Sequence, residues 1–350
     1  MSSTVKNIMR GTLRWVVGWF ATLAVVATVL YVVLALLPGD AASRKLGMDA
    51  TPEALARLRH DYGLDQPLAQ RWASWAGGIL FHGDFGTVHG TGRQVIDQVS
   101  VAMSRTALVM ALSLVGIMVL GVGLGVLAGI HAGSPLDRTA RTAALLVLCT
   151  PEFVLGTGLA LVFSARLKML PAVSLVPVNG TVLDRPEVLV LPVLTVSLLG
   201  SAMLLRQVRA VVVRQSEAPH VEAARLAGLS GSRVLWRHLM PGVWGPVLQA
   251  TAAVVPYLLG GAVVVEQVFG FPGLGSLLVD AVTAREPDLL MACIVIVVGV
   301  SLAVYRLADV VASSRSGSPS RDHAPVTGGL SRPGNRTLSR DAVRRGRVSA

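Results

Sequence analysis

Long runs without a charged residue alternate with short polar segments along this chain. Six runs are long enough to cross a bilayer as a helix, which needs about 20 apolar residues. Only one of them contains a charge, Glu152. They lie between Arg14 and Asp40, Arg105 and Asp137, Arg141 and Arg166, Glu187 and Arg206, Arg237 and Glu266, and Asp288 and Arg306. The pattern predicts an all-α membrane protein with six transmembrane helices.

The composition agrees with lipid as the solvent. The chain is 53% hydrophobic and only 15% charged, whereas soluble domains carry about 25% charged residues. Gly121, Gly123 and Gly125 lie inside the second run, where small residues allow helices to pack closely. The net charge of +11 comes from arginines that flank the apolar runs, without interleaved aromatic residues, so we expect no nucleic-acid partner.

The basic residues predict the orientation, because short cytoplasmic loops retain Lys and Arg. Most of the 31 Lys and Arg fall in the N-terminal segment, the second loop, the fourth loop and the C-terminal segment. Both termini are therefore expected in the cytoplasm. The predicted parts are a tail and first helix at 1–38, an external helical loop at 39–104, five helices at 105–312 and a disordered cytoplasmic tail at 313–350.

The first run and the external loop each contain a further signal. The apolar stretch 15–37 is longer than the 7–15 residues of a signal peptide, so we expect it to remain as a membrane span. In the loop, Thr51-Pro52-Glu53 is typical of a helix start. A second short helix is expected from Leu68 to Leu80, before the turn at 83–86. The loop caps a pore, receives a partner or only stabilises the bundle.

The fourth loop, about residues 206–242, contains the sequence Glu-Ala-Ala-Arg-Leu-Ala-Gly at 222–228 and then Pro241. Glycine tolerates positive φ, so the pattern predicts a helix that stops, turns, restarts and ends at the proline. The two alanines keep one face thin enough to enter a groove on another protein, and the glutamate offers it a charge. The expected coupling residues of this elbow are Glu222, Ala223, Ala224, Gly228 and Pro241.

Glu152 follows Pro151 inside the third run. Ionisable groups at membrane depth are costly and usually face a bundle interior or a water-filled cavity. Glu152 therefore either lines or gates a pathway, or it satisfies groups that the proline kink frees. Glu266, at the end of the fifth run, is the second candidate for a pathway or gate residue.

Motifs for chemistry are missing from the sequence. A Gly-Lys-Ser/Thr phosphate loop is absent, because Lys6, Lys45 and Lys168 are the only lysines and none follows a glycine. We expect no catalytic residue, metal or cofactor on this chain. Two other classes stay open: a membrane-embedded enzyme, which would need a second catalytic group beside Glu152, and an ion-driven secondary transporter, which would show inverted repeats and more intramembrane charge.

Over about residues 10–312 the chain resembles the membrane subunits of ATP-binding-cassette (ABC) importers, specifically the B-type permeases of dipeptide, oligopeptide and nickel systems. Five segments carry the resemblance: 62–67 (YGLDQP), 83–86 (GDFG), 150–156 (TPEFVLG), 222–228 (EAARLAG) and 261–275 (GAVVVEQVFGFPGLG). The chain departs from the family pattern of the elbow at His220, Ala227, His238 and Met240.

The resemblance implies the type I importer permease fold and a multi-pass place in the cytoplasmic membrane. It also implies partners: a second permease subunit, two cytoplasmic ATPases that bind ATP and Mg and dock on the elbow, and an external solute-binding protein. The implied activity is ATP-driven import of peptides or of a related small solute such as nickel.

Overall fold

A computed structural model describes residues 3–36, 41–47, 50–89, 91–177 and 180–315 of the chain. The segment predicted as a disordered tail lies almost wholly outside these residues. Within them the protein is built from helices, and the isolated bridge between Thr87 and Gln94 is the one β-type pairing.

The helices follow one another along the chain in three groups. The first group contains α1 (Ser3–Leu36), α2 (Ala41–Leu46), α3 (Pro52–Asp61), α4 (Leu68–Gly77) and the π-helix η1 (Gly78–His82). The second contains α5 (Val95–Ile117), the π-helix η2 (Met118–Val122), α6 (Gly123–Ile130), α7 (Pro135–Cys149), α8 (Glu152–Ala160), the π-helix η3 (Leu161–Arg166), the 3₁₀ turn η4 (Val182–Asp184) and α9 (Glu187–Ser216). The third contains α10 (Pro219–Leu226), α11 (Gly231–Val234), the π-helix η5 (Leu235–Leu239), α12 (Met240–Phe269), α13 (Leu274–Ala284) and α14 (Pro287–Arg315).

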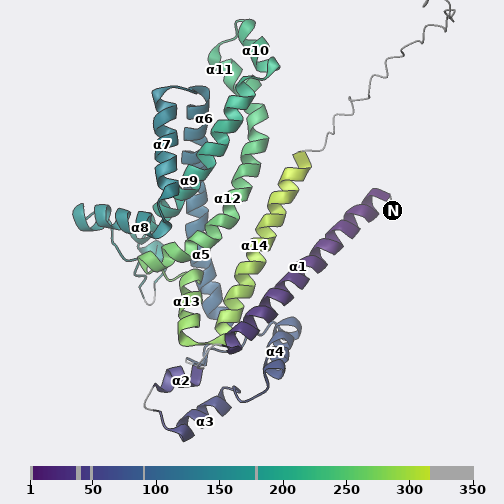
Figure 1. The fold of residues 1–350 in the computed structure, drawn as a ribbon, viewed down its shortest axis with the longest axis vertical. Helices are drawn as coiled ribbons and strands as arrows, with labels where there is room; N and C mark the ends of the chain where they lie inside the picture. The colour runs from purple at the N-terminus through teal and green to yellow at the C-terminus, as the bar shows by residue number, and fades with distance from the viewer. Residues whose placement is uncertain (1–2, 37–40, 48–49, 90, 178–179, 316–350) are drawn as a thin grey trace, which may run out of the picture.

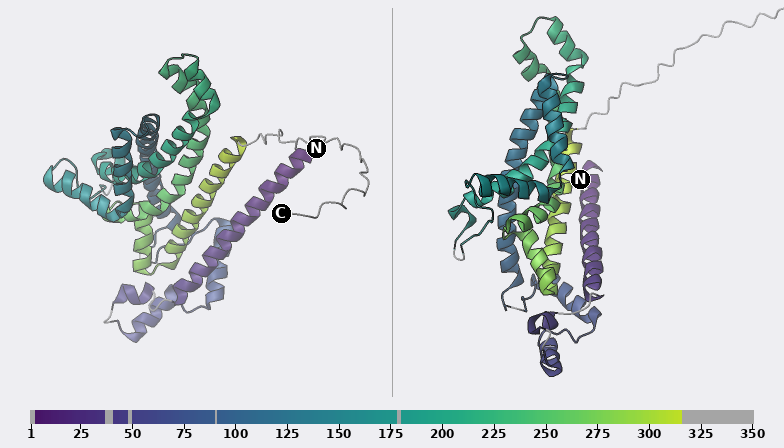
Figure 2. Two further views of the ribbon diagram at one scale, coloured as in Figure 1. Left: turned by 45° about the horizontal axis from the view of Figure 1, so that its top comes forward. Right: turned by 60° about the vertical axis from the view of Figure 1, so that its left-hand side comes forward.

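The long helices form an elongated bundle around α9 (Figure 1). In α9, 72% of the most apolar window is buried, compared with 28% in α5–α6 and 33% in α14. The short helices α10 and α11 lie at one extreme of the bundle, and α2, α3 and α4 lie at the other (Figures 1 and 2). The elbow and the loop predicted to be external are therefore at opposite ends.

Three helices in the described part are long and apolar enough to cross a membrane: Val95–Ile130, Glu187–Ser216 and Pro287–Arg306. Two bent pairs, Pro135–Cys149 with Glu152–Arg166 and Gly231–Leu258 with Gly260–Phe269, raise the number to five. The apolar segment Val17–Val33 of α1 is shorter and corresponds to the first predicted span. The structure supports a multi-pass helical protein, and the count of six remains a prediction.

The third predicted span differs from the expected kinked helix. The axes of Pro135–Cys149 and Glu152–Arg166 meet at 105°, so that α8 runs sideways from the bundle (Figure 1). The residue before a proline favours extended backbone, and Thr150 has φ −92° and ψ 124°. Because Pro151 also has no N–H to donate, the helix ends there and a new one starts at Glu152.

Close packing between α6 and α9 depends on glycines at every fourth position. A Cβ on Gly125 would lie 2.7 Å from Val208 Cβ, and one on Gly129 would lie 2.6 Å from Val212 Cβ. Gly121 faces Leu204 in the same way, whereas nothing lies within 4 Å of a Cβ on Gly123. The expected close packing is therefore confirmed at Gly121 and Gly125. It is wrong at Gly123, which does not lie on the side that faces α9.

The loop between α1 and α5 is folded, as the sequence predicts. Thr51 caps α3 by accepting a hydrogen bond from the Ala54 N–H at 3.3 Å, and α4 begins at Leu68. The loop is fastened to the corner between α13 and α14, where His89 Nδ1 donates to Glu286 Oε2 at 2.9 Å. The Tyr62 hydroxyl donates to the His89 carbonyl at 3.0 Å and so joins the α3 end of the loop to this corner.

This fastening should weaken as the pH rises. The hydrogen bond to the Glu286 carboxylate raises the pKa of His89, against the effect of its burial, and Asp288 adds to the increase. A raised pKa in the folded state means that the contribution is complete below the unfolded pKa of about 6.5 and is lost as the pH passes the folded value. Hydrogen exchange of residues 50–89 should therefore accelerate from pH 6 to pH 9.

His60 provides the control for this measurement, since it pairs with Asp65 at 2.9 Å on the exposed surface of the same loop. In the His89→Gln variant, the difference in hydrogen-exchange rate of residues 50–89 between pH 6 and pH 9 should largely disappear after correction for the intrinsic exchange rate. The His60→Gln variant should keep it. Equal pH dependence in the wild type and in His89→Gln would contradict the prediction.

Candidate functional site

The predicted elbow is a helix–turn–helix whose turn depends on Gly228. The helix α10 starts at Pro219 and ends at Leu226, with Ala227 as its C-cap. Gly228 follows with φ +75°, in the left-handed region, and nothing lies within 4 Å of the place where its Cβ would be. The glycine is required by the backbone conformation alone, which costs a residue with a Cβ about 1–2 kcal/mol.

The inner side of the elbow is clamped to the two long helices that flank it. Val221 and Val234 are buried in the same core as Val212 of α9 and Val243 of α12. Two hydrogen bonds add to this packing. His220 Nε2 donates to the His238 carbonyl at 3.1 Å, and Gln215 Nε2 donates to the Gly242 carbonyl, also at 3.1 Å. The elbow is therefore held as one body with the ends of α9 and α12.

The two alanines of the elbow do not share a face, contrary to the sequence-based prediction. Ala224 is 6% exposed and packs in the core beneath α10. Ala223 is exposed, as is Glu222. Consecutive residues of a helix are about 100° apart. Ala224 therefore lets the bundle pack closely against α10, whereas Ala223 keeps the outer surface of α10 free of bulky side chains.

The outer face of α10, formed by Glu222, Ala223 and Leu226, is exposed. Leu226 is 83% exposed. Residues three and four apart are neighbours on a helix, so Leu226 lies beside the other two. Sequence reasoning missed Leu226, although its place one turn after Glu222 is visible in the sequence. A charge, a small residue and an exposed leucine thus lie together on the surface at the tip of the molecule.

Contrary to the sequence-based prediction, Pro241 does not end the second helical segment of the elbow, which starts at Gly231. Gly231–Leu258 is one continuous helical stretch that contains α11, the π-helix η5 and the first part of α12. Pro241 is exposed at the second position of α12, directly after the π-turn. Proline cannot donate to the preceding turn, and a π-turn is one way for a helix to absorb that loss. The elbow therefore passes into α12 without a break.

A buried ion pair joins the hairpin of α6 and α7 to α9, the helix that leads into the elbow. Asp137, at the start of α7, is fully buried and accepts from Arg209 Nη2 at 2.8 Å as well as from Arg209 Nε. The Gly133 N–H donates to the same carboxylate at 2.9 Å, and Ser134 caps the helix. Sequence analysis treated Arg209 only as a topology signal. The spacing Ser134-x-x-Asp137 marks the helix start but cannot reveal a partner 72 residues away.

At the other end of α12, Glu266 is 2% exposed and fully engaged. Its Oε1 accepts a hydrogen bond from the Thr106 hydroxyl at 2.6 Å, and its Oε2 accepts one from the Ser276 N–H at 3.0 Å. The Thr106 oxygen in turn accepts from the Leu274 N–H at 2.8 Å. Glu266 and Thr106 together cap the N-terminus of α13, where a carboxylate is favourable.

The backbone between α12 and α13 folds tightly over this carboxylate. Gly270 ends α12 with φ +58°, and the buried Phe271 donates its N–H to the Glu266 carbonyl at 2.8 Å. A Cβ on Gly273 would overlap Glu266 Oε1, and one on Gly275 would lie 2.6 Å from Val263 Cα. We call residues 266–276 the hook. Its glycines are required for close approach, which explains the Gly-rich end of the segment at 261–275.

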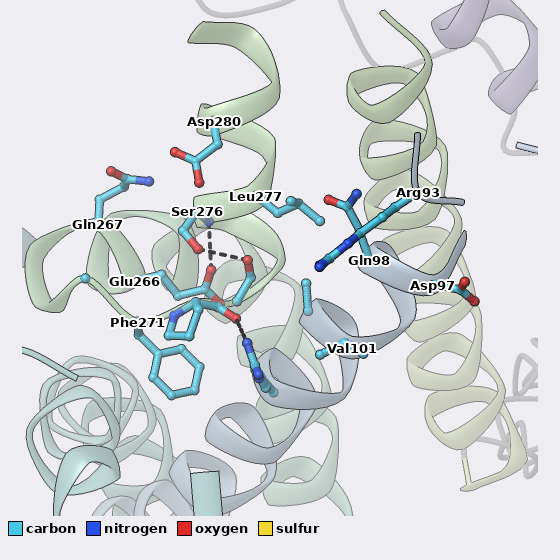
Figure 3. Close-up of a pocket in the computed structure, with 15 residues that line it drawn as sticks. Arg93, Asp97, Gln98, Val101, Glu266, Gln267, Phe271, Ser276, Leu277 and Asp280 are labelled. Atoms are coloured by element: carbon cyan, nitrogen blue, oxygen red, sulfur yellow. Dashed lines mark hydrogen bonds between the residues drawn. The ribbon is translucent and has the colours of Figure 1, made fainter. Parts of the chain in front are cut away.

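A cavity of about 580 Å³ opens beside the hook, between the start of α5 and the start of α13 (Figure 3). We call it the outer cavity. Arg105 of α5 donates to the Pro272 carbonyl at 3.3 Å and so joins the cavity wall to the hook. The polar lining of the cavity includes Arg93, Asp97, Gln98, Arg105, Gln267, Ser276 and Asp280. Glu266 also lines this cavity.

Glu152, the other candidate gate residue, lies apart from the hook. The Tyr257 hydroxyl of α12 donates to Glu152 Oε1 at 2.9 Å, and Gly261 leaves room for the carboxylate. This contact lies where α12 bends by 50°, between Leu258 and Gly260. The observed partner of Glu152 is thus a neighbouring helix rather than a group freed by Pro151. Among the described residues no three His, Cys, Asp or Glu gather as metal ligands would.

The fold and these sites define a multi-pass helical membrane protein with a clamped elbow at one end and a polar cavity toward the other. The family model of the binding-protein-dependent transport system inner membrane component matches residues 121–316, and the model of its N-terminal part matches residues 8–98. The chain belongs to this family and is a permease subunit of an ABC importer.

Named relatives cover most of the chain. A probable peptide ABC transporter permease protein, y4tP of Sinorhizobium fredii (strain NBRC 101917 / NGR234), is 29% identical over 85% of this chain and 95% of its own length. The glutathione transport system permease protein GsiC of Salmonella choleraesuis (strain SC-B67) is 31% identical over 80% of this chain and 89% of its own. A solved amino acid ABC transporter with histidines aligns with 63% of this chain and 94% of its own at 18% identity and a TM-score of 0.49.

Proposed function

We propose that this chain imports peptides, or a related small solute, as one of two permease subunits of an ATP-driven transporter. Two cytoplasmic ATPases that bind ATP and Mg would dock on the elbow, and an external solute-binding protein would deliver the substrate. The clamped elbow with its exposed outer face is the observation that carries this proposal. The substrate class is supported by the names of the relatives, one described as a peptide permease and the other as a glutathione permease.

The contacts of the elbow suggest how force would pass through the chain. Movement of an ATPase against the outer face of α10 would shift α9 and α12 together, because the Gln215–Gly242 contact joins these two helices and the His220–His238 contact joins α10 to the π-turn before α12. The Asp137–Arg209 pair would carry α6 and α7 with α9. The bend of α12 beside Glu152 and the hook at Glu266 lie farther along the same helix, so both would respond to this movement.

The same proposal places the elbow and both termini in the cytoplasm and residues 39–104 outside. A cysteine introduced at Ser74 of α4 should react with a membrane-impermeant maleimide in intact cells, and one at Ser230 should react only after the membrane is opened. Both side chains are exposed. The native Cys149 is exposed and must first be replaced by Ser, whereas Cys293 is buried. Labelling of Ser74→Cys only from the cytoplasmic side would overturn this orientation.

The function can be tested by uptake from a peptide mixture, such as a tryptic casein digest, into cells that express the complete transporter. We expect uptake that disappears when the phosphate-loop lysines of the ATPase subunits are replaced by alanine. This chain alone should hydrolyse no ATP. Uptake that survives in cells with the inactive ATPases but stops on addition of a protonophore would instead show an ion-driven secondary transporter.

A further inference from the structure

We propose that the outer cavity binds the two charged ends of a zwitterionic peptide, with the carboxylate on the α5 side and the ammonium group on the α13 side. This inference rests on the proposed peptide transport and assigns a site to it. The cavity brings together side chains of both charges from α5 and α13, and none of the three charged groups used below is ion-paired within the described part of the chain.

The cationic side of the outer cavity is formed by Arg93 and Arg105. Arg93, just before α5, extends toward Ser276 and Leu277 across the cavity, and the described residues offer its guanidinium no hydrogen bond (Figure 3). Arg105 uses one N–H for the Pro272 carbonyl and keeps further donors, since a guanidinium has five. Planar guanidinium groups with free donors suit a carboxylate, which they can bind with two parallel hydrogen bonds.

The anionic side is formed by Asp280, one turn after Ser276 on α13. Asp280 is exposed, and in Figure 3 the Gln267 amide points toward it from α12. The Asp280 carboxylate has no hydrogen-bond donor among the described residues. Glu266 is a poorer ligand than Asp280, because it is 2% exposed and its two oxygens already accept from Thr106 and from the Ser276 N–H. Asp280 is therefore the group on this wall that can receive an ammonium ion.

The size and the charge balance of the cavity both suit a short peptide. A volume of about 580 Å³ lies in the usual range of small-molecule sites, roughly 300–1,000 Å³. The α5 side has two arginines against one aspartate, Asp97, and the α13 side has Asp280. This arrangement matches a zwitterion better than an ion of one sign, because each end of the ligand meets a counter-charge. Neutral hydrogen-bonding groups between them, Gln98 and Gln267, can face the peptide backbone.

The test uses the complete transporter in lipid nanodiscs without the binding protein, and tritiated trialanine as the probe. Arg93→Gln and Asp280→Asn should each weaken trialanine binding about tenfold or more, because each removes a charge-assisted contact. Asp61→Asn is the matched control. Asp61 is exposed at the end of α3 and does not line the cavity, so the loss of its charge should leave binding unchanged. Stimulation of the ATPase by the binding protein should persist in all three variants.

Other outcomes would overturn the inference in distinguishable ways. Wild-type nanodiscs that bind no trialanine, from a transporter that takes up peptides in cells, would refute the site but not the function. Unchanged binding in Arg93→Gln and Asp280→Asn would do the same. Loss of ATPase stimulation with intact trialanine binding would show that the cavity receives the binding protein. A wild type that takes up no peptide in cells would refute the proposed function, and the inference with it.

Discussion

Replacing Glu266 by alanine should destabilise the protein more than any other single change near the cavity. The substitution leaves the Thr106 hydroxyl and the Ser276 N–H without their acceptor, and the Glu266 side chain is 2% exposed. Each buried polar group left unpaired costs about 1–3 kcal/mol, so we expect a loss of about 3 kcal/mol or more. Fluorescence-detected gel filtration after heating should show the apparent melting temperature falling by roughly 6 °C or more.

Glu266→Gln is the matched control for that loss. The amide oxygen can still accept from the Ser276 N–H. The amide nitrogen can donate to the Thr106 oxygen, which has a second lone pair beside the one used by the Leu274 N–H. We therefore expect Glu266→Gln to keep most of the stability. If both variants lost the same amount, the negative charge itself would matter rather than the pattern of acceptors.

Gly273 allows a direct check that the carboxylate fills the space under the hook. Its backbone, with φ −101° and ψ −170°, is open to any residue, so alanine at this position meets only the overlap with Glu266 Oε1. Gly273→Ala should therefore be costly in the wild type and much cheaper in a Glu266→Ala background. Such non-additivity is the signature of two residues in contact. Additive losses would contradict the described geometry.

The sequence predicts features that depend on neighbouring residues. Thr51 and Pro52 start α3 as expected, and Gly228 makes the left-handed turn, because capping and glycine conformations are local properties of the chain. The apolar runs likewise predict where the long helices lie, since a span needs only length and hydrophobicity.

Features that depend on tertiary contacts could not be predicted in the same way. The partner of His89 lies 197 residues away at Glu286, and the partner of Glu266 lies 160 residues away at Thr106. Nothing in the local pattern encodes such pairs. Pro151 and Pro241 give the same local signal, yet the first is followed by a turn of 105° and the second lies in a continuous helix after a π-turn. The packing around each proline decides between these outcomes.

The elbow should give the largest functional effect of any surface substitution. Glu222 is exposed at the tip of the molecule, so folding does not require its charge. A charge-assisted hydrogen bond to an ATPase contributes about 1.5–3 kcal/mol, which corresponds to roughly ten- to hundredfold in affinity. We expect Glu222→Lys to abolish transport and to weaken ATPase co-purification by at least this factor, while the protein inserts at normal levels. Glu222→Gln should show a smaller loss.

The two alanines separate docking from folding in the same assay. Ala223→Leu enlarges the outer face and should reduce ATPase co-purification at normal abundance. Ala224→Leu overfills the core beneath α10, where Ala224 is 6% exposed, and should lower abundance as well. If both variants lowered abundance equally, Ala223 would belong to the folded core rather than to a contact surface.

Gly228 tests whether the shape of the turn matters for coupling. Valine strains a backbone at φ +75°, whereas asparagine tolerates the left-handed region, and neither side chain would meet a neighbouring atom at its Cβ. Gly228→Val should therefore lose transport and Gly228→Asn should retain most of it, measured as ATP-dependent peptide uptake per inserted molecule. Because the second limb of the elbow continues into α12, a distorted turn would also misdirect the helix that ends at the hook. Normal uptake in both Gly228→Val and Glu222→Lys would show that the elbow is only a connecting loop, and the proposed ATPase contact would then have to lie elsewhere.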